Sequence, residues 1–135
     1  MPEEAKVMDK HELNADNIIM YILINNDLNM KKGKIASQVG HVVGIITEEI
    51  IRKSLECPTK KYVRDYLLYN TWIQNGHAKI VLKASEKELQ ELIKTEDCRY
   101  IIDAGRTQIA PNSLTVVGFF PRDDLKEKMR EFKLL

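Results

Sequence analysis

The sequence has few of the residues that build disulfide frameworks or metal centres. Its 135 residues contain two cysteines, Cys57 and Cys98. Their separation is not that of a metal-binding pair, and two are too few for a disulfide framework. The three histidines are scattered along the chain. We therefore expect reduced thiols and no bound metal.

Long apolar runs and a strong net charge are also missing. No run approaches the roughly 20 apolar residues of a membrane-spanning helix. The first 16 residues are too acidic for a signal or transit peptide. The formal net charge is +1, so no overall field attracts nucleic acid or a membrane. We expect a cytoplasmic protein without membrane contact, in which any site for a polyanion is a local patch.

Common catalytic motifs are absent as well. The sequence contains neither GxxxxGK[ST] nor GxSxG, and it has no cysteine–histidine signature. Its apolar fraction of 44% is near the average for globular proteins, which is enough for one hydrophobic core.

Apolar periodicity predicts a flexible polar arm (1–16) followed by one α/β domain (17–135). The expected order of elements is β-α-α-β-α-β-β-α. The strands are expected at 17–24, 77–84, 99–103 and 114–120, and the helices at 32–53, 59–70, 85–94 and 121–131. Because helices separate most strands, we expect a four-stranded mixed sheet in a three-layer α/β/α sandwich.

Lysines gather where the first expected helix begins, in MKKGKIASQVGH (30–41). With the free N–H groups of a helix N-terminus, these lysines would form a phosphate site, although a solvated first turn is the alternative. They are Lys31, Lys32 and Lys34. Lys34, Gln38 and His41 are also spaced to share one stripe of the helix. A hydrogen-bonded structural role is the alternative for His41.

A second polar segment, DAGRTQIAPNSLT (103–115), lies between two apolar strands. An unpaired carboxylate at the end of a buried strand is costly, so Asp103 needs a cationic or hydrogen-bonding partner. Lys34 and Arg106 are the candidates, because loops at the carboxyl ends of parallel strands meet at one edge of the sheet. The result would be either a reactive pair or a structural salt bridge.

These segments together resemble one family. MKKGKIASQVGH, KIVLKA, DAGRTQIAPNSLTVVG and the C-terminal KLL are similar to peptidyl-tRNA hydrolases of the archaeal and eukaryotic type (type 2), over roughly 18–135. The resemblance implies an α/β sandwich, usually homodimeric, that needs no cofactor. It also implies hydrolysis of the ester between a peptide and the 3′ ribose of tRNA. The catalytic residues of the family fall here on Lys34, Asp103, Thr107 and Thr115.

The resemblance also suggests which residues contact peptidyl-tRNA and its backbone. They are Lys32, Gln38, His41, Arg106, Gln108 and Ser113. Arg106 has an alternative role as a structural clamp across the loop. Two other functions remain open, a tRNA-binding module without catalysis and an adaptor that acts through protein contacts.

The chain departs from the family pattern at three places. Lys31 stands where the family usually has a small residue, and Asn25 where it often has arginine. Segment 54–70 adds about ten residues, as either a peripheral insertion or a further RNA contact.

Overall fold

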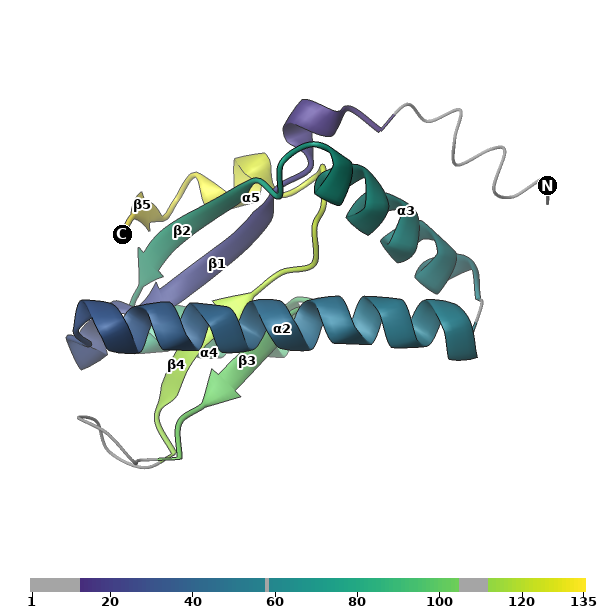
Figure 1. Ribbon diagram of the computed structural model, residues 1–135. Coiled ribbons are helices and arrows are strands. Elements are labelled where there is room, and N and C mark those ends of the chain that lie inside the picture. The colour runs from purple at the N-terminus through teal and green to yellow at the C-terminus, as the bar shows by residue number, and fades with distance from the viewer. Residues whose placement is uncertain (1–12, 58, 105–111) are drawn as a thin grey trace.

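A computed structural model describes residues 13–57, 59–104 and 112–135, which form an α/β fold (Figure 1). The strands are β1 (Met20–Asn25), β2 (Lys79–Ala84), β3 (Arg99–Ile102), β4 (Leu114–Gly118) and β5 (Lys133–Leu134). The α-helices are α2 (Lys32–Glu56), α3 (Lys60–Gln74), α4 (Glu86–Thr95) and α5 (Lys126–Met129), and the 3₁₀ turns are η1 (Ala15–Asn17) and η2 (Asn26–Leu28). None of these helices is both long and apolar enough to cross a membrane.

The five strands form one mixed sheet in the order β3-β4-β1-β2-β5. β1 and β2 are parallel, while β1–β4, β3–β4 and β2–β5 are antiparallel. It follows that β1, β2 and β3 all end at the same edge of the sheet. The mixed sheet is confirmed, but the expectation of four strands is wrong. The fifth strand, β5, has only two residues, which is too short for a periodic pattern.

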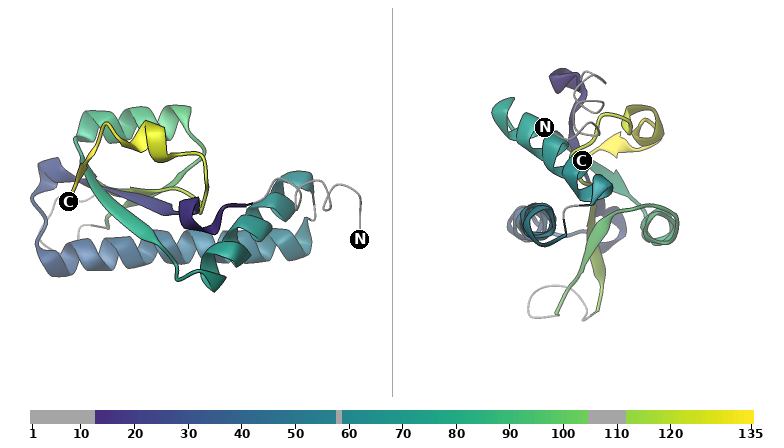
Figure 2. Two further views of the ribbon diagram at one scale, coloured as in Figure 1. Left: turned by 90° about the horizontal axis from the view of Figure 1, so that it is seen from above. Right: turned by 90° about the vertical axis from the view of Figure 1, so that its right-hand side faces the viewer.

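Helices cover both faces of the sheet (Figure 2). Tyr21 and Leu23 of β1 belong to a core cluster that includes Leu89 and Leu92 of α4. The alternate β1 residues belong to a second cluster with side chains of α2 and α3. Side chains of a strand alternate between the two faces, so a strand buried on both reads as a continuous apolar run.

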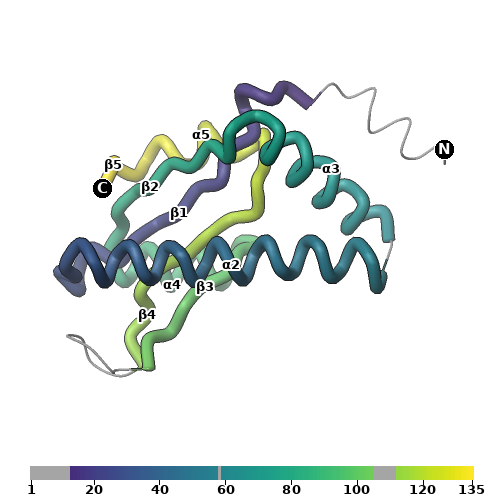
Figure 3. Tube along the Cα trace, viewed as in Figure 1, coloured from purple at the N-terminus to yellow at the C-terminus, as the bar shows by residue number. Residues whose placement is uncertain are grey.

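The helix boundaries differ from the expected ones in three places. Helix α2 continues to Glu56, and α3 continues to Gln74 along the path traced in Figure 3. The expected terminal helix at 121–131 is wrong, because only Lys126–Met129 is helical. Arg122 forms a β-bridge with Ile19, which keeps the chain extended after Pro121.

Gly118 allows β4 to pack closely against α2. A Cβ atom at this position would lie 2.9 Å from Val42 Cγ2 and 3.0 Å from Ile46 Cδ1. Val42 is fully buried and has a stiff branched side chain, so it has little room to move.

We expect Gly118→Ala to lower the free energy of unfolding by about 1–3 kcal/mol, because it overpacks this contact. Urea denaturation monitored by circular dichroism measures the change. The double variant Gly118→Ala/Val42→Ala, which removes the clashing methyl groups, provides the control. If the single variant is as stable as the wild type, the close packing of β4 on α2 is contradicted.

Candidate active site

An ion pair joins the first turn of α2 to the end of β3. Lys34 Nζ lies 2.5 Å from Asp103 Oδ1, and the two side chains are only 9% and 7% exposed. The backbone fixes the position of Asp103, because its N–H donates to the carbonyl of Ser113 at 2.9 Å. Its carbonyl accepts from the N–H of Asn112 at 2.8 Å. Of the two partners suggested by the sequence, Lys34 pairs with Asp103, and Arg106 lies outside the described residues.

A second polar contact joins α2 to β4 beside this pair. Thr115 Oγ1 donates to Gln38 Oε1 at 2.7 Å, and it also lies 3.2 Å from the Ile101 carbonyl. The register of β3 and β4 shifts so that Thr115 is an extra residue between the partners of Ile101 and Ile102. Such bulges redirect a side chain. Thr115 and Gln38 are both buried, so this contact fixes how α2 lies over β4.

A third polar junction was not predicted from the sequence. Asn25, at the end of β1, is 1% exposed. Its Nδ2 donates to the Leu114 carbonyl at 2.8 Å and to Glu86 Oε1 at 3.0 Å. Asp27 Oδ2 accepts from the N–H of Glu86 at 2.8 Å. This junction ties the start of α4 to the start of β4. The sequence signal for this junction was a polar residue, Asn25, at the end of an otherwise apolar strand.

The remaining candidate residues are less closely associated with the ion pair. Lys32 and His41 are exposed, and His41 Nε2 lies 3.4 Å from Ser37 Oγ. Ser113 is partly buried and contributes the carbonyl that accepts from Asp103. Arg106, Thr107 and Gln108 lie outside the described residues, so their predicted roles stay predictions.

The chemistry available at this edge of the sheet is that of a carboxylate beside an ammonium group. Within 13–57, 59–104 and 112–135, no three histidine, cysteine, aspartate or glutamate side chains are grouped to hold a metal ion. Burial raises the pKa of the Cys98 thiol to about 11, which keeps it protonated and a poor nucleophile. A carboxylate can orient a water molecule or remove its proton, and an ammonium group can stabilise a developing oxyanion.

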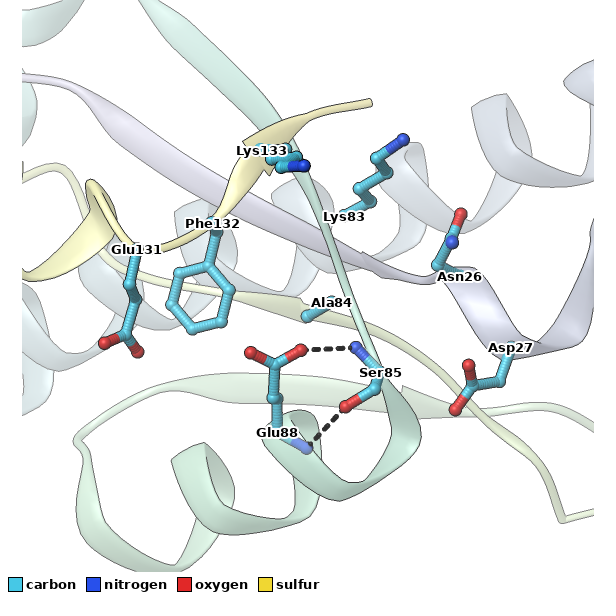
Figure 4. Close-up of a pocket in the computed structure, with 9 residues that line it drawn as sticks. All are labelled: Asn26, Asp27, Lys83, Ala84, Ser85, Glu88, Glu131, Phe132 and Lys133. Atoms are coloured by element: carbon cyan, nitrogen blue, oxygen red, sulfur yellow. Dashed lines mark hydrogen bonds between the residues drawn. The ribbon is translucent and has the colours of Figure 1, made fainter.

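A pocket of about 290 Å³ lies at the same edge of the sheet (Figure 4). Its lining includes Asp27, Ser85, Glu88 and Phe132. Ser85 and Glu88 form a capping box there, so the backbone N–H groups of these two residues already have hydrogen-bond acceptors. Neither Lys34 nor Asp103 lines the pocket, and we place the candidate active site at the ion pair, not in this hollow.

Comparison with known proteins indicates a family of hydrolases. Residues 18–135 match the sequence model described as Peptidyl-tRNA hydrolase PTH2. A peptidyl-tRNA hydrolase of Metallosphaera sedula is 35% identical over 126 residues, which cover 86% of this chain and 98% of the relative. One from Methanococcus maripaludis is 38% identical over 122 residues, covering 84% and 96%. A probable peptidyl-tRNA hydrolase 2 of Schizosaccharomyces pombe is 37% identical over 108 residues, covering 76% and 47%.

Proposed function

The chain belongs to the PTH2 family of peptidyl-tRNA hydrolases, and we propose that the pair Lys34–Asp103 carries out its reaction. The enzyme hydrolyses the ester that joins a peptide to tRNA. The observation that supports this site is the contact between a largely buried ammonium group and a buried carboxylate at the edge where three strands end.

The proposed reaction is direct attack by water. Asp103 orients the water and takes its proton as the oxygen bonds to the ester carbonyl carbon. Lys34 holds the carboxylate ionised and stabilises the negative charge that develops on the carbonyl oxygen. The bond to the ribose oxygen then breaks, and the proton goes to this leaving oxygen. The products are a tRNA with a free ribose hydroxyl and a peptide carboxylic acid, which loses its remaining proton to the solvent to give the carboxylate.

The other candidate residues have supporting roles in this proposal. Thr115 is fully buried, so it acts through Gln38 as a positioning residue that fixes how α2 packs on the sheet. Lys32, which is exposed in the first turn of α2, contacts the tRNA backbone as a sequence-independent charge.

A turnover assay tests the function. The purified protein is expected to release peptide and free tRNA from peptidyl-tRNA over many cycles, without added metal or cofactor. Binding of tRNA without release would identify a binding module. A protein that neither binds nor hydrolyses the substrate would favour the adaptor role.

We also propose that the protein is a cytoplasmic homodimer. The supporting feature is an exposed strip of small residues on α2, formed by Ser37, Gly40 and Gly44. An added Cβ at either glycine meets no atom within 4 Å, so internal packing does not require a small residue there. Sedimentation at the mass of a monomer at micromolar concentration would rule out the dimer.

Three expectations about chain organisation remain proposals. We propose that helices on both faces make a three-layer α/β/α sandwich and that 17–135 is one domain after the arm 1–16. Segment 54–70, which spans the last turn of α2 and the first part of α3, is proposed as a peripheral insertion. Limited proteolysis that cuts inside 17–135 before it removes the arm would contradict these boundaries.

A further inference from the structure

Two lysines lie directly opposite each other in the sheet. Lys83 of β2 and Lys133 of β5 are partners in the antiparallel register. Side chains of such partners share one face, with Cβ atoms about 4.5–5.5 Å apart, and like charges at these positions destabilise a sheet. In the part of the chain that the structure describes, neither lysine forms an ion pair. Neither positive charge therefore has an ion-pair partner there, although both lysines line the pocket of Figure 4 together with Asp27, Glu88 and Glu131.

Protection of a sheet edge does not explain this pair. A lysine on an edge strand prevents pairing with other chains, which accounts for Lys133, because β5 is at the edge. Lys83 is on β2, which β5 already covers, and its side chain is partly buried. A second lysine opposite the first adds repulsion without adding protection. A bound anion would offset the repulsion between these two lysines.

The pair lies on the face of the sheet that α2 covers. Lys83 is the register partner of Ile24, and Ile24 packs in the cluster that includes Val42 of α2. In Figure 4 the Lys83 side chain points away from Glu88 and Glu131, whose carboxylates lie on the other side of β2. An anion that approaches the pair from the α2 side would therefore meet positive charge before these carboxylates.

The pair also lies at the catalytic end of the molecule. Figures 1 and 2 place the end of β2, strand β5 and the first turn of α2 together at one end. With strands spaced at about 4.8 Å, β2 and β5 lie roughly 14 and 19 Å from β3 along the sheet. A few nucleotides of a single strand cover that distance, and exposed Lys32 in the first turn of α2 adds a cation at the same end.

From these observations we propose that Lys83 and Lys133 form a binding site for a phosphodiester group of the RNA substrate, near the 3′ end that carries the ester. This proposal rests on the proposed function, because it takes RNA as the ligand. The two ammonium groups bind the phosphate as sequence-independent charges. The site holds the acceptor strand across β2 and β5 while the ester lies at Lys34 and Asp103.

Binding of deacylated tRNA as a function of salt tests the site without depending on hydrolysis. The variants are Lys83→Gln, Lys133→Gln and their double, with Lys83→Arg/Lys133→Arg to restore the charge. Lys126→Gln, an exposed lysine of α5, is the matched control. Each lost lysine should lower the slope of log Kd against log salt by about 0.7, which is roughly a fourfold loss of affinity at 0.15 M salt relative to 1 M.

A second substrate separates phosphate binding from a structural effect. An N-blocked aminoacyl ester of adenosine has the ester and the ribose but no phosphate, so the glutamine variants should hydrolyse it at the wild-type rate. The arginine variant should bind tRNA as the wild type does. Equal losses on the phosphate-free ester, or a double variant with the same salt slope as Lys126→Gln, would overturn the proposal.

Failure of the site and failure of the proposed function give different results. If the wild type hydrolyses peptidyl-tRNA but the double variant binds tRNA like the control, only the site is wrong. If the wild type hydrolyses neither ester while the glutamine variants lose affinity for tRNA, the function is wrong and the site remains. A wild type that does not bind tRNA overturns the site directly.

Discussion

Replacing Asp103 with asparagine is expected to lower kcat for peptidyl-tRNA by about 100-fold or more, the usual scale for a positioned acid–base group. Asparagine has nearly the same shape, but its amide cannot accept a proton from water. It also removes the negative charge that faces Lys34 Nζ at 2.5 Å. Steady-state hydrolysis with purified peptidyl-tRNA measures the loss, and KM should change little, because Asp103 is not among the residues proposed to contact the tRNA backbone.

Asp97→Asn is the matched control for this variant. Asp97 lies two residues before β3, at the opposite end of the strand from Asp103, and its side chain is 51% exposed. The Asp97→Asn substitution makes the same chemical change in a surface ion pair, and such a pair contributes at most about 1 kcal/mol to stability. Hydrolysis should stay at the wild-type rate. A folded Asp103→Asn enzyme that also keeps this rate would reject the catalytic role of Asp103.

Replacing Lys34 with alanine is expected to have two large effects. Hydrolysis should fall by about 100-fold or more, because the developing oxyanion and the Asp103 carboxylate both lose their nearby cation. The free energy of unfolding should fall by about 3–5 kcal/mol, because a buried carboxylate loses the cation that faces it. Rate assays and urea denaturation measure the two effects separately.

Lys94→Ala controls for the loss of a lysine side chain. Lys94 is exposed in the last turn of α4, on the face of the sheet away from α2. This variant should keep both the wild-type rate and the wild-type stability. If Lys34→Ala hydrolyses peptidyl-tRNA normally, the ion pair is structural, which is the alternative that the sequence left open.

The strongly periodic elements of the fold were predictable from the sequence. Apolar residues spaced by four along α2 are buried at Val42, Ile46 and Ile50. The sequence SEKE (85–88), which is typical of a capping box, forms one with both of its hydrogen bonds. Helix α3 is harder to predict, because Tyr66 fits the apolar spacing of this helix but is 41% exposed. Leu68 and Trp72 are buried instead. Tyrosine is amphipathic, so its position in a pattern does not show which face is covered.

The candidate site was predictable only in part. The order of strands and loops gave Lys34 as one of two candidate partners of Asp103, since both residues lie at the edge where β1 and β3 end. The sequence could not indicate that Gln38 turns inward to Thr115, because this depends on the bulge in β4. It also could not reveal the register pair Lys83–Lys133, because β5 is too short to recognise.

The hydrolysis rate of a charge-neutral double variant, Lys34→Met/Asp103→Asn, tests the catalytic role of the ion pair most directly. Replacing both partners of a buried ion pair with neutral groups of similar shape avoids an unpaired charge, so stability should remain close to that of the wild type. We expect a folded protein that binds tRNA but hydrolyses peptidyl-tRNA at least about 100-fold more slowly. A folded double variant that hydrolyses it at the wild-type rate would exclude a catalytic role for this pair.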